Sequence, residues 1–398
     1  MTPLLDGVVV LDLCRLATLA TTKLADLGAE VIKIEEPPHG DYLRGLPPIL
    51  PQYGVGLFYL MMNRNKKSVG LNLKSDEGRR IFFELLAGAD ALVEVSKPGA
   101  FARLGLDYES VRAAKPDIIY CSVTGYGQTG PYRDLPSHGM NIDAAAGLLQ
   151  IERGPDGRPE IKVASALGLE MGGANAALGV LAALHRRTVT GEGAYLDISC
   201  WDGAVAHSTL LPPALNMGSA AAFDNPLRPG GIGPKYNVYG TKDDKVLLIC
   251  PIEKKFWVAF CAAVGKDEWA GRGRYDGPMD YGESDPQLRD DIEEVMRTRT
   301  LDEWMETLLA ADVPVSPVLG PDDLVDNPHA EARGMFGTTD DPRYAGLRWV
   351  STAVRATGTG WRVALPPPVL GEHTTEILGR LGYDDEAQAR LRADGVIA

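Results

Sequence analysis

The chain has 398 residues, of which 45% are hydrophobic and 24% are charged, and its formal net charge is −14. This length exceeds one ordinary hydrophobic core, so we expect two domains. The acidic balance argues against binding to nucleic acid or to an anionic membrane surface, although a local group of cations can still hold a small anionic ligand.

Short apolar strands alternate with helical segments in the first third of the chain. Ser75 precedes one of these helices as an N-cap, with acidic residues in the first turn. The alternation predicts an α/β domain with a Rossmann-like parallel sheet covered by helices on both faces. The expected strands lie within residues 7–13, 30–37, 90–96 and 117–127, and the expected helices lie within 20–29 and 75–89.

The middle of the chain begins with a segment rich in glycine and alanine, residues 168–187, which predicts a buried and closely packed helix. A strand and a helix are expected over 193–207. An irregular stretch rich in Gly, Pro and Asn follows and is the best linker candidate. We therefore expect the first part of a large domain over 1–211, a linker over 212–234, a small α+β domain over 235–313, and a return linker with the rest of the large domain over 314–398.

The five cysteines are scattered and form neither a Cys-x-x-Cys pair nor a cluster with histidine. This pattern predicts buried, reduced thiols in a cytoplasmic protein, without a zinc site or a disulfide framework. The first residues, MTPLLDGVVVLDL, are typical of a strand rather than a signal peptide. No apolar run approaches the roughly 20 residues of a membrane span.

The first strand–helix turn, DLCRLATLATTKLADLG, lacks the GxGxxG pattern of dinucleotide-binding proteins. No nicotinamide or flavin site is therefore expected. The chain also lacks the GxxxxGK[ST] pattern of nucleoside triphosphate sites and the GxSxG pattern of serine hydrolases.

Cations gather in the segment MMNRNKKSVGLNLKS, residues 61–75, which contains Arg64, Lys66, Lys67 and Lys74. Such a run is either a solvated strand edge or a phosphate-binding patch. Lys97, in VSKPGA, and the glycine-rich turn SVTGYGQTGP, residues 122–131, lie at the C-terminal ends of predicted strands. In an open α/β sheet, the carboxyl ends of the strands form the ligand crevice.

Six stretches together carry a family resemblance that covers the chain from about residue 5 to about residue 337. They are LADLGAEVIKIEEPPHGD, NRNKKSVGLNLKSDEGR, KPGAFARLGLDYE, SVTGYGQTGPY, GVLAALHRRTVTGEGAYLDIS and SPVLGPDDLVDNPHAEARGMF. In these stretches and their order, the chain resembles the class III CoA-transferase family. That family includes formyl-CoA and carnitinyl-CoA transferases and α-methylacyl-CoA racemase.

The resemblance implies a large Rossmann-like domain built from both chain ends and a smaller domain reached through two long linkers. It also implies an interlocked homodimer that binds acyl-CoA between the domains, with coenzyme A as part of the substrate and no metal. Under this resemblance the basic segment faces the CoA phosphates or adenine, and the glycine-rich turn lies beside the pantetheine. The implied CoA-binding residues are Arg64, Asn65, Lys66, Lys67, Lys97, Gly125, Tyr126 and Gly127.

The transferases of this family use an aspartate carboxylate as the nucleophile on the acyl-CoA. Aligned on that pattern, this chain has Gly168 or Leu169 at the aspartate position, and the nearest carboxylate is Glu170. A glutamate displaced by a residue points around the helical turn, which disfavours the standard transfer chemistry. The same departure removes the second base that a racemase would use.

The racemases of this family carry a catalytic histidine in a GHDIN segment, and here SHGMN places His138 at the same distance from Gly147. Glu253, in IEKKFW, matches the glutamate that pairs with that histidine. A carboxylate beside an imidazole fixes its tautomer and stabilises the protonated form. Without the resemblance, His138 would be a residue at a helix start and Glu253 an ordinary acid near a helix N-terminus.

Three functions follow from these residues. The favoured one is 1,1-proton transfer at the α-carbon of an acyl-CoA, with His138 as an acid/base, Glu253 as its orienting partner and Glu170 as a second carboxylate. The alternative is CoA transfer between an acyl-CoA and a free carboxylic acid through an acyl-enzyme anhydride at Glu170. The third is a CoA-thioester-binding protein without catalysis.

Overall fold

The computed structural model describes residues 2–15, 19–162, 166–209, 211–217, 233–273, 277–285 and 287–398. The chain forms two compact units, which are described separately below. The first unit is built from both ends of the chain, Met1–Ser208 and Glu331–Ala398, and the second unit is Thr209–Ala330. Most of the predicted linker 212–234 lies outside the described residues, but its first part belongs to helix α8 (Leu211–Met217).

The first unit contains a parallel sheet with the strand order β10-β7-β6-β1-β2-β5. Read from β5, this is the doubly wound order in which the chain starts in the middle of the sheet and reverses direction between β1 and β6. The predicted α/β, Rossmann-like sheet is therefore confirmed. Its strands are β1 (Val9–Cys14), β2 (Glu30–Glu35), β5 (Lys66–Gly70), β6 (Ala91–Val95), β7 (Ile119–Thr124) and β10 (Ala194–Ser199).

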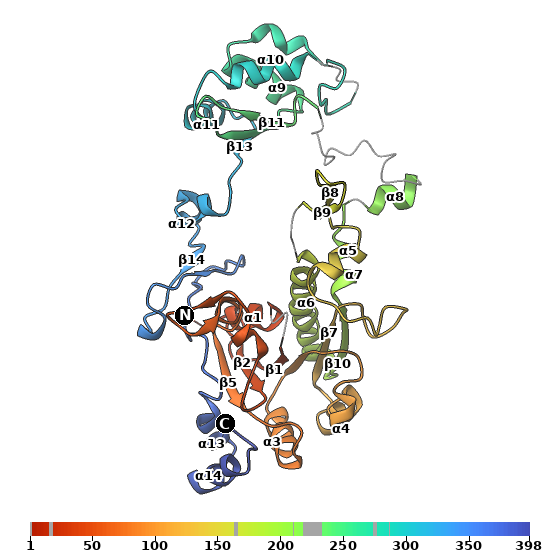
Figure 1. Cartoon of the computed structure of the whole chain (residues 1–398), viewed down its shortest axis with the longest axis vertical. Helices are drawn as coiled ribbons and strands as arrows, with labels where there is room; N and C mark the ends of the chain where they lie inside the picture. Colours follow the sequence, from red (N-terminus) through yellow and green to blue (C-terminus); the bar gives the residue numbers. More distant parts are fainter. Residues whose placement is uncertain are drawn as a thin grey trace. The chain divides into compact units, whose positions relative to one another are not determined.

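Helices cover both faces of this sheet because its strand side chains point alternately to opposite faces. On one face, Leu11, Ile32 and Leu92 pack with α3 (Asp76–Ala87) and with the C-terminal helices α13 (Thr374–Arg380) and α14 (Asp385–Ala393). On the other face, alternate strand residues pack with α1 (Leu19–Asp26) and α6 (Leu167–Thr190). Figure 1 shows α6 running beside β7 and β10. Ser75 accepts a hydrogen bond from the Gly78 N–H, as predicted for the N-cap of α3.

Helix α6 is closely packed along one face, whereas the sequence predicts a helix that is buried on most sides. A Cβ on Gly172 would collide with Sγ of Cys200, and one on Gly173 would lie 2.7 Å from Cβ of Leu19. The opposite face leaves Leu178 and Val189 exposed. By length and composition alone, α6 is long and apolar enough to cross a membrane, contrary to the expectation that no run approaches that length. It packs against α1 and the sheet, as a core helix does.

The second unit pairs a small antiparallel sheet with helices. Its sheet has the order β11 (Asn237–Gly240), β12 (Val246–Ile249) and β13 (Val315–Pro317), so the third strand comes from the segment expected to form the return linker. The helices α9 (Lys254–Ala263), α10 (Leu288–Met296) and α11 (Leu301–Ala310) enclose a core around Trp257, Phe260 and Trp304.

Shorter elements complete the described part of the chain. The helices are α2 (Leu57–Met62), α4 (Tyr108–Ala114), α5 (Met140–Ala145), α7 (Cys200–Ala206) and α12 (Pro328–Ala332). The antiparallel strand pairs are β3 (Ile49–Leu50) with β4 (Val55–Gly56), β8 (Ile151–Arg153) with β9 (Pro159–Ile161), and β14 (Phe336–Gly337) with β15 (Trp349–Val350).

Candidate functional site

A cavity of about 390 Å³ opens at the carboxyl ends of β1, β2, β5 and β6, where the strand order reverses. Ligands of open α/β sheets bind in this position. We call it the switch-point cavity. It is lined by Leu13, Arg15, Ile34, Glu36, Leu71, Leu73, Lys74, Ser96, Ala100, Phe101, Arg103 and Leu104.

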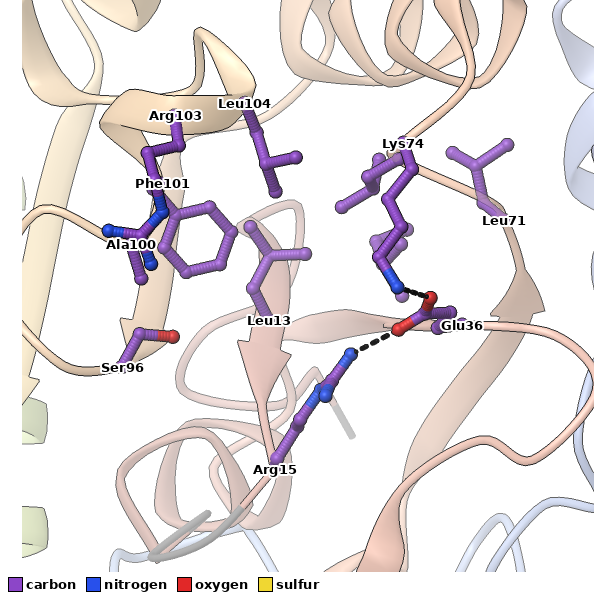
Figure 2. A pocket seen from close by; sticks show the side chains of 12 residues that line it. Leu13, Arg15, Glu36, Leu71, Lys74, Ser96, Ala100, Phe101, Arg103 and Leu104 are labelled. Atoms are coloured by element: carbon purple, nitrogen blue, oxygen red, sulfur yellow. Dashed lines mark hydrogen bonds and ion pairs between the residues drawn. The ribbon is translucent and has the colours of Figure 1, made fainter.

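Cations outnumber carboxylates in the switch-point cavity. Figure 2 shows Arg15 and Lys74 both reaching Glu36, with Phe101 and Arg103 on the facing wall. Nη2 of Arg15 lies 2.7 Å from Oε2 of Glu36. The hydrogen bond from Lys74, together with that from Arg15, lowers the pKa of Glu36. Within the described residues, the guanidinium of Arg103 contacts the Gly99 carbonyl and pairs with no carboxylate. The surplus of guanidinium and ammonium groups suits phosphate oxygens.

The predicted basic segment is paired internally. Lys66 is fully buried in strand β5, and its Nζ lies 2.9 Å from Oδ2 of Asp12 on β1. The resemblance implies that Lys66 faces the ligand, but its side chain points into the protein. Successive side chains of a strand point to opposite faces, so Lys66 and Lys67 cannot lie on the same side of the sheet. Lys67, the next residue, pairs with Glu30 and Glu376 nearer the surface.

The other residues of that segment also bind their own chain. Arg64 forms an ion pair with Asp26, and the side-chain amide of Asn65 donates to the same carboxylate. Contact of Arg64, Asn65, Lys66 and Lys67 with CoA stays a prediction. Lys74 is the member of the cationic run that reaches the switch-point cavity.

The glycine-rich turn after β7 meets the segment that carries His138. A Cβ on Gly125 would collide with Oγ of Ser137, so the close approach requires glycine there. The hydroxyl of Tyr126 donates to the carbonyl of Asn141 at 3.3 Å. Gly127 has a φ of 86°, which favours glycine, and its N–H donates to Oγ1 of Thr124. The structure thus joins two of the predicted site segments.

His138 stands exposed just before helix α5. Its backbone N–H donates to Oδ1 of Asn141 at 2.9 Å, and no hydrogen bond reaches its imidazole from the described residues. Glu253 occupies the N-cap position of α9 in the second unit and makes no capping bond. Because the two units are described separately, the pairing of His138 with Glu253 stays a prediction.

The first turn of α6 lies beside the His138 segment. A Cβ on Gly139 would be 3.5 Å from Cβ of Ala166 and 3.8 Å from Cδ1 of Leu169. Glu170, one residue further on, is exposed in this first turn, where the helix macrodipole favours a carboxylate. The described residues form no hydrogen bond to the Glu170 carboxylate.

A second carboxylate, Asp143 on α5, holds the start of α6. It is fully buried and accepts the N–H groups of Leu167 at 3.0 Å and Gly168 at 2.7 Å. Ala166, the N-cap residue of α6, supplies no side-chain cap, so Asp143 provides it. A Cβ on Gly168 would collide with Ile142 and lie 3.1 Å from Oδ1 of Asp143. Space for an aspartate at residue 168 is therefore absent in this arrangement.

Replacing Asp143 with alanine is expected to lower the free energy of unfolding by about 2 kcal/mol, because the N–H groups of Leu167 and Gly168 at the start of α6 lose their acceptor. Urea denaturation measures the change. Asp156→Ala, at an exposed turn, is the control and should change stability by less than about 0.5 kcal/mol. Equal stability of the two variants would contradict the capping role.

Sequence reasoning missed Arg15, Glu36, Phe101 and Arg103. The rule that selected Lys97 applies to Arg15, which follows the predicted strand 7–13, and to Glu36, which lies at the end of the predicted strand 30–37. Lys97 itself is exposed and lines a neighbouring cavity, together with Glu94 and Gln128.

Comparison with known proteins places these features in a family. CoA-transferase family III matches residues 5–374. The acetyl-CoA:oxalate CoA-transferase of Acetobacter aceti is 34% identical, covering 83% of this chain and 85% of that protein. The succinyl-CoA:glutarate CoA-transferase of Homo sapiens is 32% identical, covering 99% of this chain and 90% of that protein. The succinyl-CoA–L-malate CoA-transferase beta subunit of Chloroflexus aurantiacus is also 32% identical, covering 99% and 98%.

Solved structures give the same family. A CAIB/BAIF family protein from Brucella suis has a TM-score of 0.77 and 28% identity, covering 96% of this chain and 100% of that chain. Rv3272 from M. tuberculosis has a TM-score of 0.80 and 27% identity, covering 94% and 99%. The names of the curated relatives support the alternative of CoA transfer more than the favoured expectation of a racemase.

Proposed function

The chain belongs to CoA-transferase family III, and we propose that it transfers CoA from an acyl-CoA to a free dicarboxylic acid. The observation that carries this proposal is the exposed carboxylate of Glu170 in the first turn of α6, a turn that lies beside the His138 segment. The class of acceptor is proposed from the relatives, which are named for oxalate, glutarate and malate.

Glu170 would act as the nucleophile of a covalent route. Its carboxylate attacks the thioester carbonyl and expels the CoA thiolate, leaving an acyl-glutamyl anhydride. The thiolate then attacks the glutamyl carbonyl, which releases the first acid and leaves a glutamyl-CoA thioester. The acceptor carboxylate then attacks the glutamyl-CoA thioester and expels the CoA thiolate, which leaves a second anhydride. The thiolate attacks the acceptor's carbonyl in this anhydride, so the new acyl-CoA leaves and the Glu170 carboxylate is regenerated. Asp143 would hold the turn that presents Glu170.

The switch-point cavity would hold the anionic part of CoA. Three cations, Arg15, Lys74 and Arg103, line this cavity together with one carboxylate, Glu36, and the ring of Phe101. These side chains fit phosphate oxygens and a flat base. Lys97 and the turn Gly125–Gly127 would follow the pantetheine toward α6.

Replacing Arg103 with alanine is expected to raise the Kd for CoA about tenfold, because one charge-assisted hydrogen bond to a phosphate is lost. Isothermal titration calorimetry measures this change. Arg390→Ala removes an exposed arginine from α14 and should leave the Kd unchanged. A Kd for Arg103→Ala equal to that of the control would remove the phosphate-binding role.

The proposed reaction is tested with succinyl-CoA or acetyl-CoA and a panel of free dicarboxylic acids, with new acyl-CoA species detected by mass spectrometry. We expect transfer to at least one acid, with ping-pong kinetics. Deuterium gain at the α-carbon of a 2-methylacyl-CoA in D₂O, without transfer, would instead support the racemase. Binding of CoA without either reaction would support a protein that has lost catalysis.

A further inference from the structure

A second cavity, of about 430 Å³, lies in the first unit at the carboxyl ends of β6 and β7. Ala100 and Phe101 line both this cavity and the switch-point cavity. We call it the Glu94 cavity, after the carboxylate at its inner wall. Neither the proposed nucleophile nor the cations assigned to the CoA phosphates line it.

Glu94 ends a short hydrogen-bonded chain in this cavity. Nε2 of Gln128 donates to Oγ of Ser122 at 2.7 Å, and Ser122 Oγ donates to Oε1 of Glu94. Glu94 is only 5% exposed, and its other oxygen, Oε2, has no hydrogen-bond partner among the described residues. A buried carboxyl oxygen without a partner is costly, and a bound group that donates to it is one way to meet this cost. Burial raises the pKa of Glu94 to about 7, and the side chains of Ser122 and Ser96 oppose the effect.

The lining of the Glu94 cavity has the opposite charge balance to the switch-point cavity. Glu94, Asp107 and Glu109 are acidic, and Lys97 is the cation among the lining residues. Asp107 is partly engaged as the N-cap of α4, whereas Glu109 is exposed and lies 4.0 Å from Arg112. The wall therefore favours a positively charged ligand over an anion.

Aromatic rings form another part of the wall. Tyr108, Tyr120 and Tyr195 lie against one another with ring centroids 5.0 to 5.9 Å apart. Carboxylates combined with aromatic faces are the groups that bind organic ammonium ions, because the charge meets both an anion and the negative face of a ring. Methylene groups of such a ligand would also pack on the rings.

We propose that the Glu94 cavity binds a small organic ammonium compound, whose N–H group donates to Oε2 of Glu94 and whose carbon chain lies on the tyrosine rings. The unpartnered buried oxygen, the acidic lining and the tyrosine cluster each favour this class of ligand. The inference goes beyond the proposed CoA transfer and does not depend on it.

The test titrates the 398-residue chain with 1,4-diaminobutane in a calorimeter, without CoA. We expect saturable binding, at least a tenfold weaker affinity for Glu94→Gln, and an unchanged affinity for Glu386→Gln, which alters an exposed acid on α14. Lys97→Gln removes a like charge from the wall and should tighten binding about threefold.

Circular dichroism and thermal melting establish that each variant is folded. If Glu94→Gln fails to fold, Lys97→Gln and Tyr195→Ala carry the test, because both side chains reach the surface; Tyr195→Ala should weaken binding. Absence of diamine binding at millimolar concentration, or equal affinity of Glu94→Gln and Glu386→Gln, would each overturn the proposal. The transfer assay has its own readout, so the two proposals fail separately.

Discussion

Replacing Glu170 with glutamine is expected to lower kcat for CoA transfer by about a thousandfold or more, while the Kd for CoA stays within about twofold. The amide keeps the size of the side chain but cannot attack a thioester carbonyl. The cations of the switch-point cavity lie on other elements, so CoA still binds. Stopped reactions analysed for acyl-CoA products measure the rate, and calorimetry measures the affinity.

Glu386→Gln is the matched control, because Glu386 is also an exposed glutamate in the first turn of a helix. It should retain full activity. Trapping the wild-type reaction with hydroxylamine or borohydride should modify residue 170. Full activity of Glu170→Gln, or a trapped adduct on Asp143 in its place, would show that another carboxylate is the nucleophile.

The large unit of the fold could be predicted because its signals are local. Apolar, β-branched runs mark β1, β2, β6 and β7, and Ser75 with two acids marks the start of α3. Strand β13 escaped prediction because three residues beside prolines carry little pattern, and pairing with β12 decides its conformation. Helix α6 also continues to Thr190, past the predicted end at residue 187, and this extension escaped prediction because the β-branched residues 188–190 are weak helix formers.

The candidate site was harder to predict because it depends on strand order. Lys97 and the turn at Gly125 were found from their position after a strand, whereas the convergence of Arg15, Lys74 and Arg103 follows from β1, β5 and β6 meeting at one edge. Nothing in the local sequence links Asp143 to the start of α6, 24 residues later.

The burial of Lys66 also depends on strand pairing, and it affects the stability of the fold. Its Nζ contacts Asp12 and Oγ1 of Thr21, both at 2.9 Å, in an interior shared with Lys33. Burial would raise the pKa of Asp12, but the ammonium of Lys66, followed by that of Lys33, holds it well below its usual range. A carboxyl with a lowered pKa stabilises the fold above its unfolded pKa of about 4, and this stabilisation is lost as the pH falls through the folded value.

Replacing Lys66 with methionine is therefore expected to lower the free energy of unfolding at pH 7 by about 3–5 kcal/mol, because Asp12 loses its nearest cation in a buried position. Urea denaturation measures this loss. Lys67→Met, on the same strand but paired nearer the surface, should cost less than about 1 kcal/mol. The double variant Asp12→Asn, Lys66→Met should be more stable than Lys66→Met alone, because it removes the buried carboxylate charge of Asp12 that has lost its cation. Equal midpoints for Lys66→Met and Lys67→Met would contradict this account.

The buried pair also bears on the ligand site, because it lies beneath the end of β1. Nζ of Lys33 forms an ion pair with Asp41 and donates to the carbonyl of Cys14, the residue before Arg15. Asp12 accepts the N–H of the same cysteine at 2.8 Å. Loss of Lys66 leaves this end of the strand without its balanced charges, so we expect Lys66→Met to weaken CoA binding as well as the fold, although Lys66 is buried away from the cavity. Arg390→Ala, which removes an exposed arginine from α14, should leave the Kd for CoA unchanged, and this separates the effect from the loss of any surface cation.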